Sequence, residues 1–593
     1  MTLDAYDTLT IPDTVPEGDG QFIGYTIEDD GELIKIYQPG EIIHSEELVQ
    51  FSEIKFIPYF AQNVVEVDNM EDLLDVDSDA IVSLTADIDY DGEDVGAGIG
   101  SGEFNGILLG NGHKISNFTI DANDEQINAG LIDFSGDGCQ VYDLELSDVI
   151  LSTYSAYGAG FLIGESDGYT VISNVKVTNV SLDVVDYKTY NYAVAGIGGL
   201  IGTMGAGIVY NSHVDNFDST ATIDLEEVDD DQKAETIGGL VGYENSMERG
   251  GLRIIDSSIT NSTIISSEGI ESASVGGIIG ICDNSTDFGL ELRNNKVSDS
   301  TIAIVNSNSN GASCTNEIGG FIGSESNYIR NQRDDKQTPN LVVNNEIIDT
   351  EVKFTNTNTT DASTVHIGGF AGYACSDFNN SEPDGGAIYS GNSIDAKITV
   401  TSLGTNPIAA GGFFGILDIW NNGYASTYIN DNYININMNI DSNAANHSNI
   451  GGLLGYGAIE GSAPVYICRN IVDGILKADD GSVESIENYS TTGGYIGYFL
   501  NADSDVIIEK AFISLQVTCE NFASSIFYYE NDAMGDSESC SITIGEMYVD
   551  NNSILGNVNE ELETVIDVDS DFFTITGFSS YYWEVIDGAV CLK

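Results

Sequence analysis

Three short segments place acidic residues at alternate positions, a spacing that could bind a cation. In calcium loops, carboxylate oxygens spaced in this way converge on the ion where the chain turns at a glycine. Asp87, Asp89 and Asp91 match the first half of such a loop, but the twelfth position holds Gly98 instead of a bidentate Glu. Ca²⁺ binding by these three aspartates is therefore a hypothesis, and the alternative is that they are solvated side chains on a strand. The three segments are DVDSD at 75–79, DIDYDGED at 87–94 and DVDSD at 567–571.

A basic insertion in the longest repeat interval is a second candidate for ligand binding. Its sequence is ESNYIRNQRDDKQTPN, at 325–340, and it holds Arg330, Arg333 and Lys336 in a chain with only 19 Lys and Arg. Extra length in one repeat emerges as a loop, and loops often carry recognition residues. These three residues could bind an anionic glycan or a neighbouring subunit, and the alternative is an exposed loop without a role.

Other residue types that often do chemistry show no metal-binding spacing. The five His are scattered, and H-E-x-x-H does not occur. The eight Cys form no C-x-x-C pair, so we expect most of them to be small buried side chains, with one or two disulfides as the alternative. Carboxylate pairs suited to glycoside hydrolysis would arise by chance among 95 acidic residues, so they do not discriminate. We predict no catalytic residue.

The charge of the chain limits its partners. Its 95 acidic and 19 basic residues give a formal net charge of −76. In dilute buffer this charge opposes any compact state by self-repulsion. At molar salt the Debye length falls to about 3 Å and the repulsion is screened, so the composition favours a saline habitat or many bound cations. It argues against nucleic acid as a partner, because phosphate backbones are bound through clustered Lys and Arg.

The elements that position these residues come from an internal repeat. A block of two glycines, two apolar residues and a glycine occurs eight times, with copies starting 40, 38, 43, 49, 43, 40 and 42 residues apart. Between blocks, apolar residues alternate with Asn, Asp, Ser and Thr, as at 171–184 and 428–440. This period of two predicts strands, and the fixed repeat predicts a solenoid. The second glycines of the blocks are Gly199, Gly239, Gly277, Gly320, Gly369, Gly412, Gly452 and Gly494.

Each repeat has two families of short strands, which suggests two solenoid rungs per repeat, each of about 20 residues. At the corners the paired glycines would supply positive φ or close backbone approach, with the two apolar residues between them pointing inward. We expect Asn174, Asn294, Asn344 and Asn432 at corners, where Asn tolerates the left-handed conformation and can form side-chain ladders along the axis.

With these blocks the chain resembles the GLUG-motif repeat proteins, whose Gly-Leu-aliphatic-Gly blocks stack as a right-handed parallel β-helix in microbial and viral surface adhesins. FNGILLGNGHKISNFTI at 104–120 resembles their opening rungs, and TGFSSYYWEVIDGAVCLK at 576–593 resembles their end piece. The resemblance covers residues 66–593. It implies the fold but transfers no catalytic group, because the motif is structural.

We predict an all-β protein in three parts. Residues 1–65 would form a small N-terminal β module that caps or attaches the rod, and residues 66–510 the right-handed parallel β-helix. Residues 511–593 would supply the final rungs and a C-terminal cap, because solenoid ends must be covered to protect their edge strands. The uncharged window at 189–212 carries glycines of the repeat, so it is interpreted as a rung and no transmembrane segment is predicted.

The leading functional hypothesis is a non-enzymatic rod on an extracellular or virion surface, which mediates adhesion to or recognition of a host surface in a saline environment. A tail spike, a fibre or a capsid decoration would fit. The N-terminus shows no basic segment followed by an apolar stretch, as a secretory signal would, and this places the virion setting slightly ahead.

Two alternatives stay open: a cell-surface adhesin of a halophilic or marine microbe, and a polysaccharide lyase or glycosidase on the same scaffold. The expected partners are a glycan or protein of a host or neighbouring-cell surface, and other virion or surface proteins bound through the N-terminal module. A homotrimer and a single rod both remain open.

Overall fold

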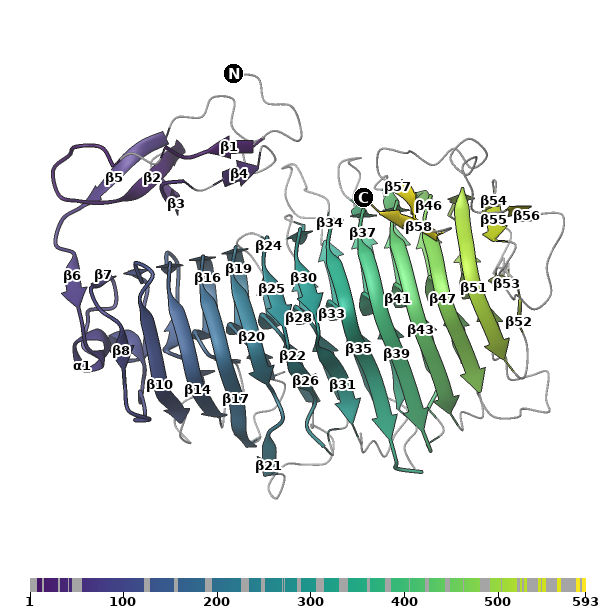
Figure 1. The fold of residues 1–593 in the computed structure, drawn as a ribbon, viewed down its shortest axis with the longest axis horizontal. Helices are drawn as coiled ribbons and strands as arrows, with labels where there is room; N and C mark the ends of the chain where they lie inside the picture. Colours follow the sequence, from purple (N-terminus) through teal and green to yellow (C-terminus); the bar gives the residue numbers. More distant parts are fainter. Residues whose placement is uncertain are drawn as a thin grey trace.

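The chain forms a long parallel β-helix with a small antiparallel module beside its first turns (Figure 1). The computed structural model describes residues 8–12, 15–29, 32–40, 42–44, 56–121, 128–153, 158–186, 195–224, 234–246, 251–268, 270, 272–284, 289–305, 314–329, 340–359, 363–378, 386–404, 406–421, 426–442, 448–461, 463–479, 491–502, 504–519, 523–524, 527–530, 542–544, 547–550, 563–566, 583–586 and 589–592.

One repeat makes one turn of the coil, with strands in three parallel sheets. From β27 (Ser272–Gly276) the chain passes a glycine pair and runs through β28 (Ile279–Asn284) and β29 (Glu291–Arg293). It then turns a corner into β30 (Lys296–Ser298) and β31 (Thr301–Val305). It returns as β32 (Thr315–Gly319), whose Gly319 lies opposite Gly276. The expectation of two rungs per repeat is wrong, because the two families of short strands belong to different sheets of the same turn.

Sheet 1 carries the strands that follow the corner. Its remaining strands are β8 (Ile88–Asp89), β10 (Lys114–Asp121), β14 (Glu145–Thr153), β17 (Lys176–Asp186), β20 (His213–Asp218), β21 (Thr222–Asp224), β25 (Ser258–Thr260), β26 (Thr263–Ile265), β35 (Glu346–Asn356), β39 (Ser393–Ser402), β43 (Tyr433–Ser442), β47 (Ile471–Asp479), β51 (Ala511–Cys519), β55 (Met547–Asp550) and β56 (Glu563–Ile566).

Sheet 2 carries the short strands that enter the glycine pairs. Its remaining strands are β11 (Asn128–Ala129), β15 (Gly158–Gly160), β18 (Ala195–Gly198), β22 (Ala234–Gly238), β36 (Thr364–Gly368), β40 (Ile408–Gly411), β44 (Asn449–Gly451), β48 (Thr491–Gly493) and β52 (Ala523–Ser524).

Sheet 3 carries the strands between the glycine pair and the corner. Its remaining strands are β6 (Val65–Val67), β7 (Ile81–Leu84), β9 (Ile107–Leu109), β12 (Ile132–Ser135), β13 (Gln140–Tyr142), β16 (Ile163–Ser173), β19 (Ile201–Tyr210), β23 (Val241–Ser246), β24 (Leu252–Ile255), β33 (Ile322–Ile329), β34 (Asn340–Val343), β37 (Ala371–Phe378), β38 (Ala387–Ser390), β41 (Phe414–Asn421), β42 (Thr427–Asn430), β45 (Leu454–Gly461), β46 (Val465–Cys468), β49 (Ile496–Ala502), β50 (Val506–Glu509), β53 (Phe527–Glu530) and β54 (Ile542–Ile544).

The glycine pairs allow close backbone approach between turns. A Cβ added to the second glycine of a block would lie 2.0 Å from the carbonyl oxygen of the next turn's second glycine at Gly412, and 2.2 Å from it at Gly199. The glycines that the repeat singles out, which are all described, do not have positive φ. Of the two reasons expected for glycine here, close approach therefore holds and positive φ does not.

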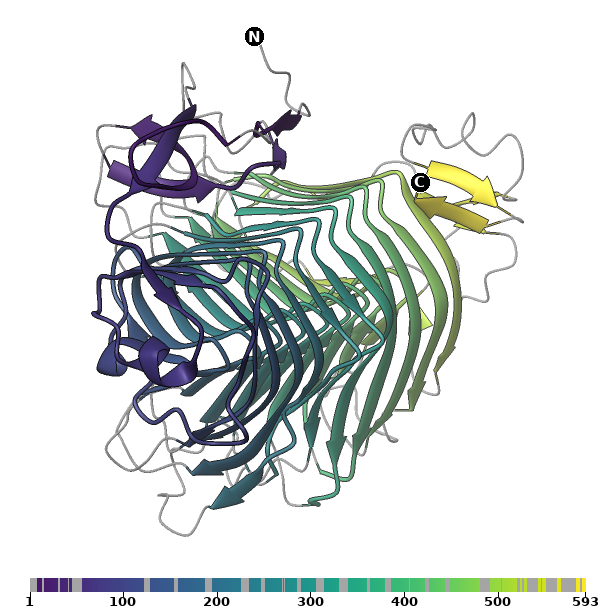
Figure 2. The same cartoon turned by 60° about the vertical axis from the view of Figure 1, so that its left-hand side comes forward.

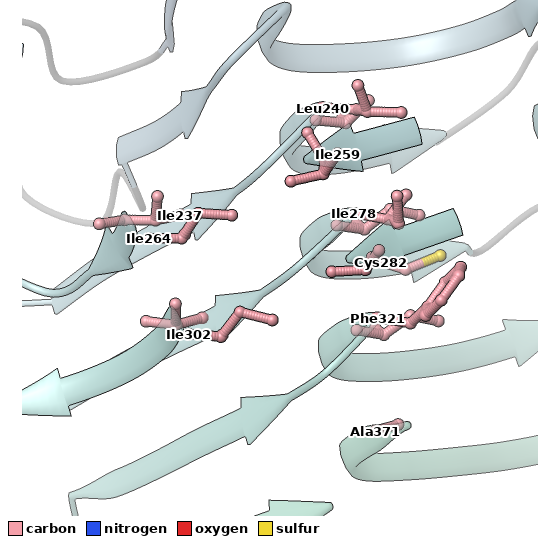
Figure 3. Close-up of a cluster of buried hydrophobic side chains, with 14 of the residues drawn as sticks. Ile237, Leu240, Ile259, Ile264, Ile278, Cys282, Ile302, Phe321 and Ala371 are labelled. Atoms are coloured by element: carbon pink, nitrogen blue, oxygen red, sulfur yellow. The ribbon is translucent and has the colours of Figure 1, made fainter. Parts of the chain in front are cut away.

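The two apolar residues between the glycines fill the interior, as predicted. Leu240, Ile278 and Phe321 follow one another in consecutive turns, each fully buried (Figure 3). In later turns this column becomes aromatic: the Phe321 and Phe370 rings stack at 5.1 Å, and the Phe370 and Phe413 rings at 4.9 Å. Each turn thus presents the same inward position to its neighbours, which lets one hydrophobic core run the length of the coil.

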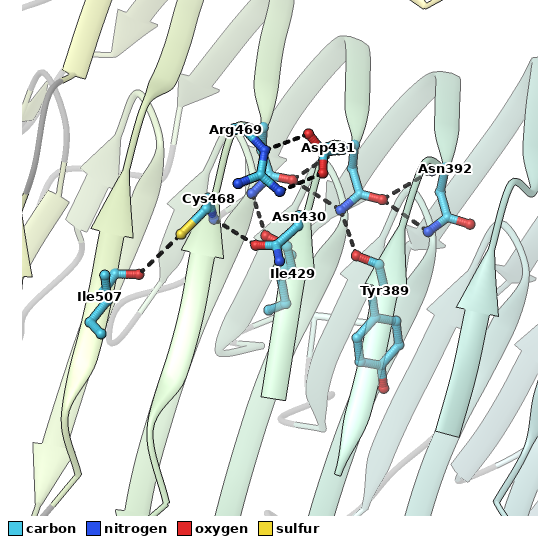
Figure 4. A network of polar contacts seen from close by, with 10 residues as sticks. Tyr389, Asn392, Ile429, Asn430, Asp431, Cys468, Arg469 and Ile507 are labelled. Atoms are coloured by element: carbon cyan, nitrogen blue, oxygen red, sulfur yellow. Dashed lines mark hydrogen bonds and ion pairs between the residues drawn. The ribbon is translucent and has the colours of Figure 1, made fainter. Parts of the chain in front are cut away.

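A ladder of buried asparagines lines the corner between sheets 3 and 1. Asn295, Asn345, Asn392, Asn432 and Asn470 occupy it in consecutive turns and are fully buried. Each of the first four donates its amide Nδ2–H to the side-chain oxygen of the next, at 2.9 to 3.1 Å. Each ladder amide also donates to a backbone carbonyl of the preceding turn, as Asn432 does to Tyr389 at 3.0 Å (Figure 4).

The residue before each ladder position makes the turn itself. Asn174, Asn294 and Asn344 have φ of 57°, 54° and 56°, so the left-handed conformation expected for them is confirmed. At the fourth position Asp431 takes this conformation, with φ of 58°, and Asn432 is the ladder residue behind it. Where the ladder is present, the corner thus combines two adjacent residues, one that tolerates positive φ and one that bonds along the axis.

Residues before β6 form a separate antiparallel module. Its strands β2 (Gln21–Asp29), β3 (Glu32–Tyr37) and β5 (Phe56–Ala61) form one sheet, and β1 (Thr8–Thr10) pairs with β4 (Ile42–His44). The module packs on the outer face of sheet 3 in the first turns (Figure 2). Ile23, Ile36 and Ala61 share a core with residues of β9, β13 and β16.

The two ends of the chain carry further small elements. The helix α1 (Met70–Leu74) directs buried Met70 and Leu73 into the interior of the first turn, and the 3-10 element η2 (Ile99–Gly102) follows. The hairpin of β57 (Trp583–Ile586) and β58 (Ala589–Leu592) ends the described chain. The first turn therefore buries apolar side chains from α1 at its open side.

We predict that Asn392→Ala destabilises the coil by about 2–3 kcal/mol or more, because it removes the four buried hydrogen bonds that the Asn392 side chain makes to Asn345, Val342 and Asn432. Urea unfolding in molar salt would measure the loss. Asn437→Ala, on the exposed face of β43, is the control and should change stability by less than about 0.5 kcal/mol. Equal effects of the two variants would contradict a structural role for the ladder.

We predict that Gly412→Ala destabilises by about 3 kcal/mol or more, because the new methyl would overlap the Gly452 carbonyl oxygen, 2.0 Å from it. The control is Gly136→Ala, whose methyl would meet only the movable side chain of Asn105, at 3.0 Å. Urea midpoints of the two variants provide the comparison. A Gly412 variant as stable as the wild type would exclude the close approach.

Candidate functional site

Two exposed aromatic side chains of the described coil, Trp420 and Tyr428, lie on the outer face of sheet 3 in its later turns, and the partly buried Tyr456, Tyr466 and Tyr498 lie on the same face. We call these five residues the aromatic patch. Trp420 is 45% exposed and Tyr428 36% exposed. Large aromatic side chains at this level of exposure, gathered on one rigid face, are typical of recognition surfaces.

The register of the strands arranges the four tyrosines of the patch in two columns, while Trp420 lies opposite Glu460. Tyr428 of β42 lies opposite Tyr466 of β46, and their rings stack at 4.9 Å with an angle of 6°. Tyr456 of β45 lies opposite Tyr498 of β49, and their rings stack at 5.5 Å with an angle of 2°. Parallel in-register strands hold these rings in nearly fixed orientations, so little rotamer freedom is left to lose on binding.

Asp418 holds the Trp420 end of the patch. Its carboxylate accepts a hydrogen bond from the Trp420 indole nitrogen at 2.5 Å and another from the Tyr373 hydroxyl at 3.3 Å. Tyr373, Ile416 and Tyr456 belong to one register column. The indole therefore sits on the sheet face with its polar edge bonded and nearly half of its surface open to solvent.

The Tyr428 column is continuous with the surface that holds the N-terminal module. Going back along the register it passes Ile388 and Leu341, then the ion pair of Arg253 with Glu291 at 2.6 Å. Further back it reaches Ile208, Val171, Gln140 and Ile107, and the module covers Ile107 and Val171. One outward column thus carries an occupied apolar surface at one end of the coil and the aromatic patch at the other.

The three aspartates of the calcium hypothesis bond to protein groups. Asp87 Oδ1 accepts from the backbone N–H of Lys114 and contacts His113 Nδ1, each at 3.1 Å, and these contacts lower the pKa of Asp87. Asp89 Oδ1 accepts from the Asp91 N–H and from Asn117, which lower the pKa of Asp89.

Within the described ranges, no three His, Cys, Asp or Glu side chains gather as metal ligands would. Calcium binding at Asp87, Asp89 and Asp91 stays a prediction that this geometry does not support. Arg330, Arg333 and Lys336 lie outside the described residues. The candidate cation site and the candidate basic loop therefore do not enter the site built here.

An interior polar cluster is the second grouping of chemically capable residues. Glu244, Cys282 and Glu325 lie opposite one another on β23, β28 and β33, and all are fully buried. The Cys282 thiol donates to Glu244 at 3.2 Å, and the Tyr389 hydroxyl lies 3.0 Å from both oxygens of Glu325. Asn340 also donates to Glu325, at 3.2 Å.

Burial keeps the Cys282 thiol and the Tyr389 hydroxyl of the interior polar cluster in their neutral, unreactive forms. Desolvation first, and then the nearby Glu244 and Glu325 carboxyl groups, raise the pKa of the Cys282 thiol well above its usual value. Desolvation and Glu325 raise the pKa of the Tyr389 hydroxyl in the same way. A nucleophilic Cys needs a lowered pKa and access to substrate, so this cluster is structural.

A G-x-S-x-G sequence, typical of hydrolase nucleophiles, occurs at 164–168. Its Ser166 lies within strand β16, is 1% exposed and hydrogen-bonds Thr170 Oγ1 at 2.6 Å. The hydrolase motif instead requires an exposed serine on a sharp strand-to-helix turn. Ser166 is therefore an interior hydroxyl of the coil.

The cysteines whose side chains the structure describes form no disulfide, as expected for most of the eight. Cys139, Cys282, Cys375 and Cys468 are buried and Cys314 is partly buried. The side chains of Cys519, Cys540 and Cys591 lie outside the described part.

Sequence reasoning missed the interior polar cluster and the individual members of the aromatic patch. The signal for the cluster was present: the second residue after each glycine block is Met204, Glu244, Cys282, Glu325, Ala374 and Leu417 in consecutive turns. Aligning the repeats would have placed two carboxyl groups in an apolar column. The patch gives a weaker signal, because its two columns lie on different strands in the turns that carry it.

No helix in the ranges described here has the length and apolarity needed to cross a membrane. No protein-family model matches the sequence, and the curated proteins contain no match to it.

Burial of Cys139 should make the fold less stable at high pH. Its pKa is raised to about 12 by desolvation, against 9.0 for a solvated thiol. The unfolded chain therefore releases this proton above pH 9 while the folded chain retains it. The stability is complete well below that pH and declines toward pH 12, by roughly 2 kcal/mol over the first two pH units.

Urea unfolding of the wild type and Cys139→Ala at pH 8 and pH 11 would test this effect, since the variant lacks the titration and should lose less stability between those values. Equal losses would show that the thiol does not contribute to the pH dependence.

Proposed function

We propose that this protein is a non-enzymatic recognition rod, displayed on a virion or cell surface, which binds a host or neighbouring-cell surface in saline water. The observation that carries the proposal is the aromatic patch, with Tyr428 and Tyr466 stacked at 4.9 Å on the outer face of a rigid coil. A solenoid presents such an array without folding a separate binding domain. The net charge of −76 supports the saline setting, because salt screens the self-repulsion.

We also propose that the chain is a GLUG-type repeat protein. The support is the block sequence itself and the structural use of each block, with paired apolar residues inside and glycines at close backbone contacts. In this view the tail spike, fibre or capsid decoration and the microbial adhesin are two settings for one kind of rod. The N-terminal module would then contact other surface proteins through the side that does not face sheet 3.

The function can be tested by incubating the fluorescently labelled full chain with microbial cells from saline water at molar salt. We expect saturable surface binding that the unlabelled chain displaces and that the double variant Trp420→Ala/Tyr428→Ala weakens about tenfold. Ile475→Ala is the matched control, because this side chain is 37% exposed but lies on sheet 1. Absence of binding to any surface, or release of reducing sugar ends by the chain, would overturn the proposal.

A further inference from the structure

We propose that the aromatic patch binds an extended, uncharged polysaccharide that lies along the coil axis. This inference rests on the proposed function and names the ligand class of the same surface. The site consists of Trp420, Tyr428, Tyr456, Tyr466 and Tyr498, with polar groups of Asp418 and Asn430 beside them.

The chemistry of the patch fits a sugar. A pyranose ring presents C–H groups on its faces and hydroxyl groups around its edge, so it binds where aromatic surface lies beside hydrogen-bond acceptors. Trp420 exposes 45% of its surface, and its indole nitrogen is held by Asp418 at 2.5 Å. The stacked tyrosines lie on the same face, and a tyrosine hydroxyl can both donate to and accept from sugar hydroxyls.

The repeat of the patch fits a polymer. Successive strands of a sheet lie about 4.8 Å apart, so equivalent side chains recur at this interval along the axis. The ring centroids of Tyr428 and Tyr466 follow this spacing at 4.9 Å, and those of Tyr456 and Tyr498 at 5.5 Å. An extended linear glycan advances by a similar distance with each sugar, so neighbouring sugars meet equivalent groups on neighbouring turns.

The charge of the chain selects an uncharged ligand. With a formal net charge of −76, the protein repels polyanions such as uronate or sulfated glycans, and a second copy of itself, wherever salt does not fully screen its charge. A neutral polysaccharide experiences neither repulsion. Its binding should therefore be nearly independent of salt over the range in which the chain stays folded.

The surface already serves as a binding face elsewhere. The Tyr428 column continues to Ile107 and Val171, where the N-terminal module is docked. Sheet 3 can therefore hold a second body on this side of the coil without disturbing the interior.

Isothermal titration calorimetry of the full chain, at the lowest salt concentration at which circular dichroism shows it folded, tests the inference with soluble mannan, dextran, laminarin and hydroxyethylcellulose, and alginate and heparin are the anionic comparison. We expect at least one neutral polymer to bind and neither anionic polymer to do so. Trp420→Ala and Tyr428→Ala should each weaken binding about threefold, which for the two together gives about tenfold. Ile475→Ala should leave it unchanged, and circular dichroism would verify that all three variants are folded.

Three results would overturn the inference: binding of anionic polymers alone, neutral binding that Trp420→Ala and Tyr428→Ala leave intact, or no polymer binding together with a salt-dependent dimer that Tyr428→Ala abolishes. The last result would assign the patch to a second copy of the chain. If labelled protein binds cells through the patch while every neutral polymer fails, this inference is wrong and the proposed function stands. If it binds no cell surface, the proposed function fails.

Discussion

Each turn of the coil must return to the path of the preceding turn at the spacing of hydrogen-bonded strands, and the rest of the structure depends on this constraint. Strand spacing leaves little room at the glycine pair. A Cβ on Gly412 would lie only 2.0 Å from the Gly452 carbonyl oxygen of the next turn. The same constraint makes each inward side chain pack against its own equivalent. The same steric requirement therefore applies at the equivalent position of every turn.

Columns of equivalent residues favour side chains that can pack against or hydrogen-bond to an identical side chain in the next turn. The asparagine ladder satisfies this condition, because an amide is both donor and acceptor, and each member from Asn295 to Asn432 bonds the next. Carboxylates repel their own kind, and the chain separates them: Cys282 lies between Glu244 and Glu325 in the interior. On the outside, Asp431 lies beside Arg469 and accepts two hydrogen bonds from it, each at 2.7 Å.

The repeat blocks were sufficient to predict the all-β solenoid and its inward apolar pairs, because glycine spacing and strand alternation are local signals. The blocks were not sufficient to predict the number of turns per repeat, because the sequence pattern of two strand families is the same whether they lie in one sheet or in two. Asn294 was recognisable as a corner residue, but Asn432 was assigned to the turn when it belongs to the ladder behind it. The docking of Ile36 near Tyr142 was beyond prediction, because it joins residues 106 positions apart in sequence.

The inward residues of sheet 3 determine which residues lie on its outer face, because successive side chains of a strand point to opposite faces. A chain with a net charge of −76 must place most of its carboxylates outside, and an uncharged aromatic column on that surface gives up hydration that charged groups would supply. Tyr428 and Trp420 remain 36% and 45% exposed, so burial compensates only part of that loss. Folding alone gives little reason to keep these rings outside, whereas a ligand that covers them would complete their burial and turn the same exposure into binding free energy.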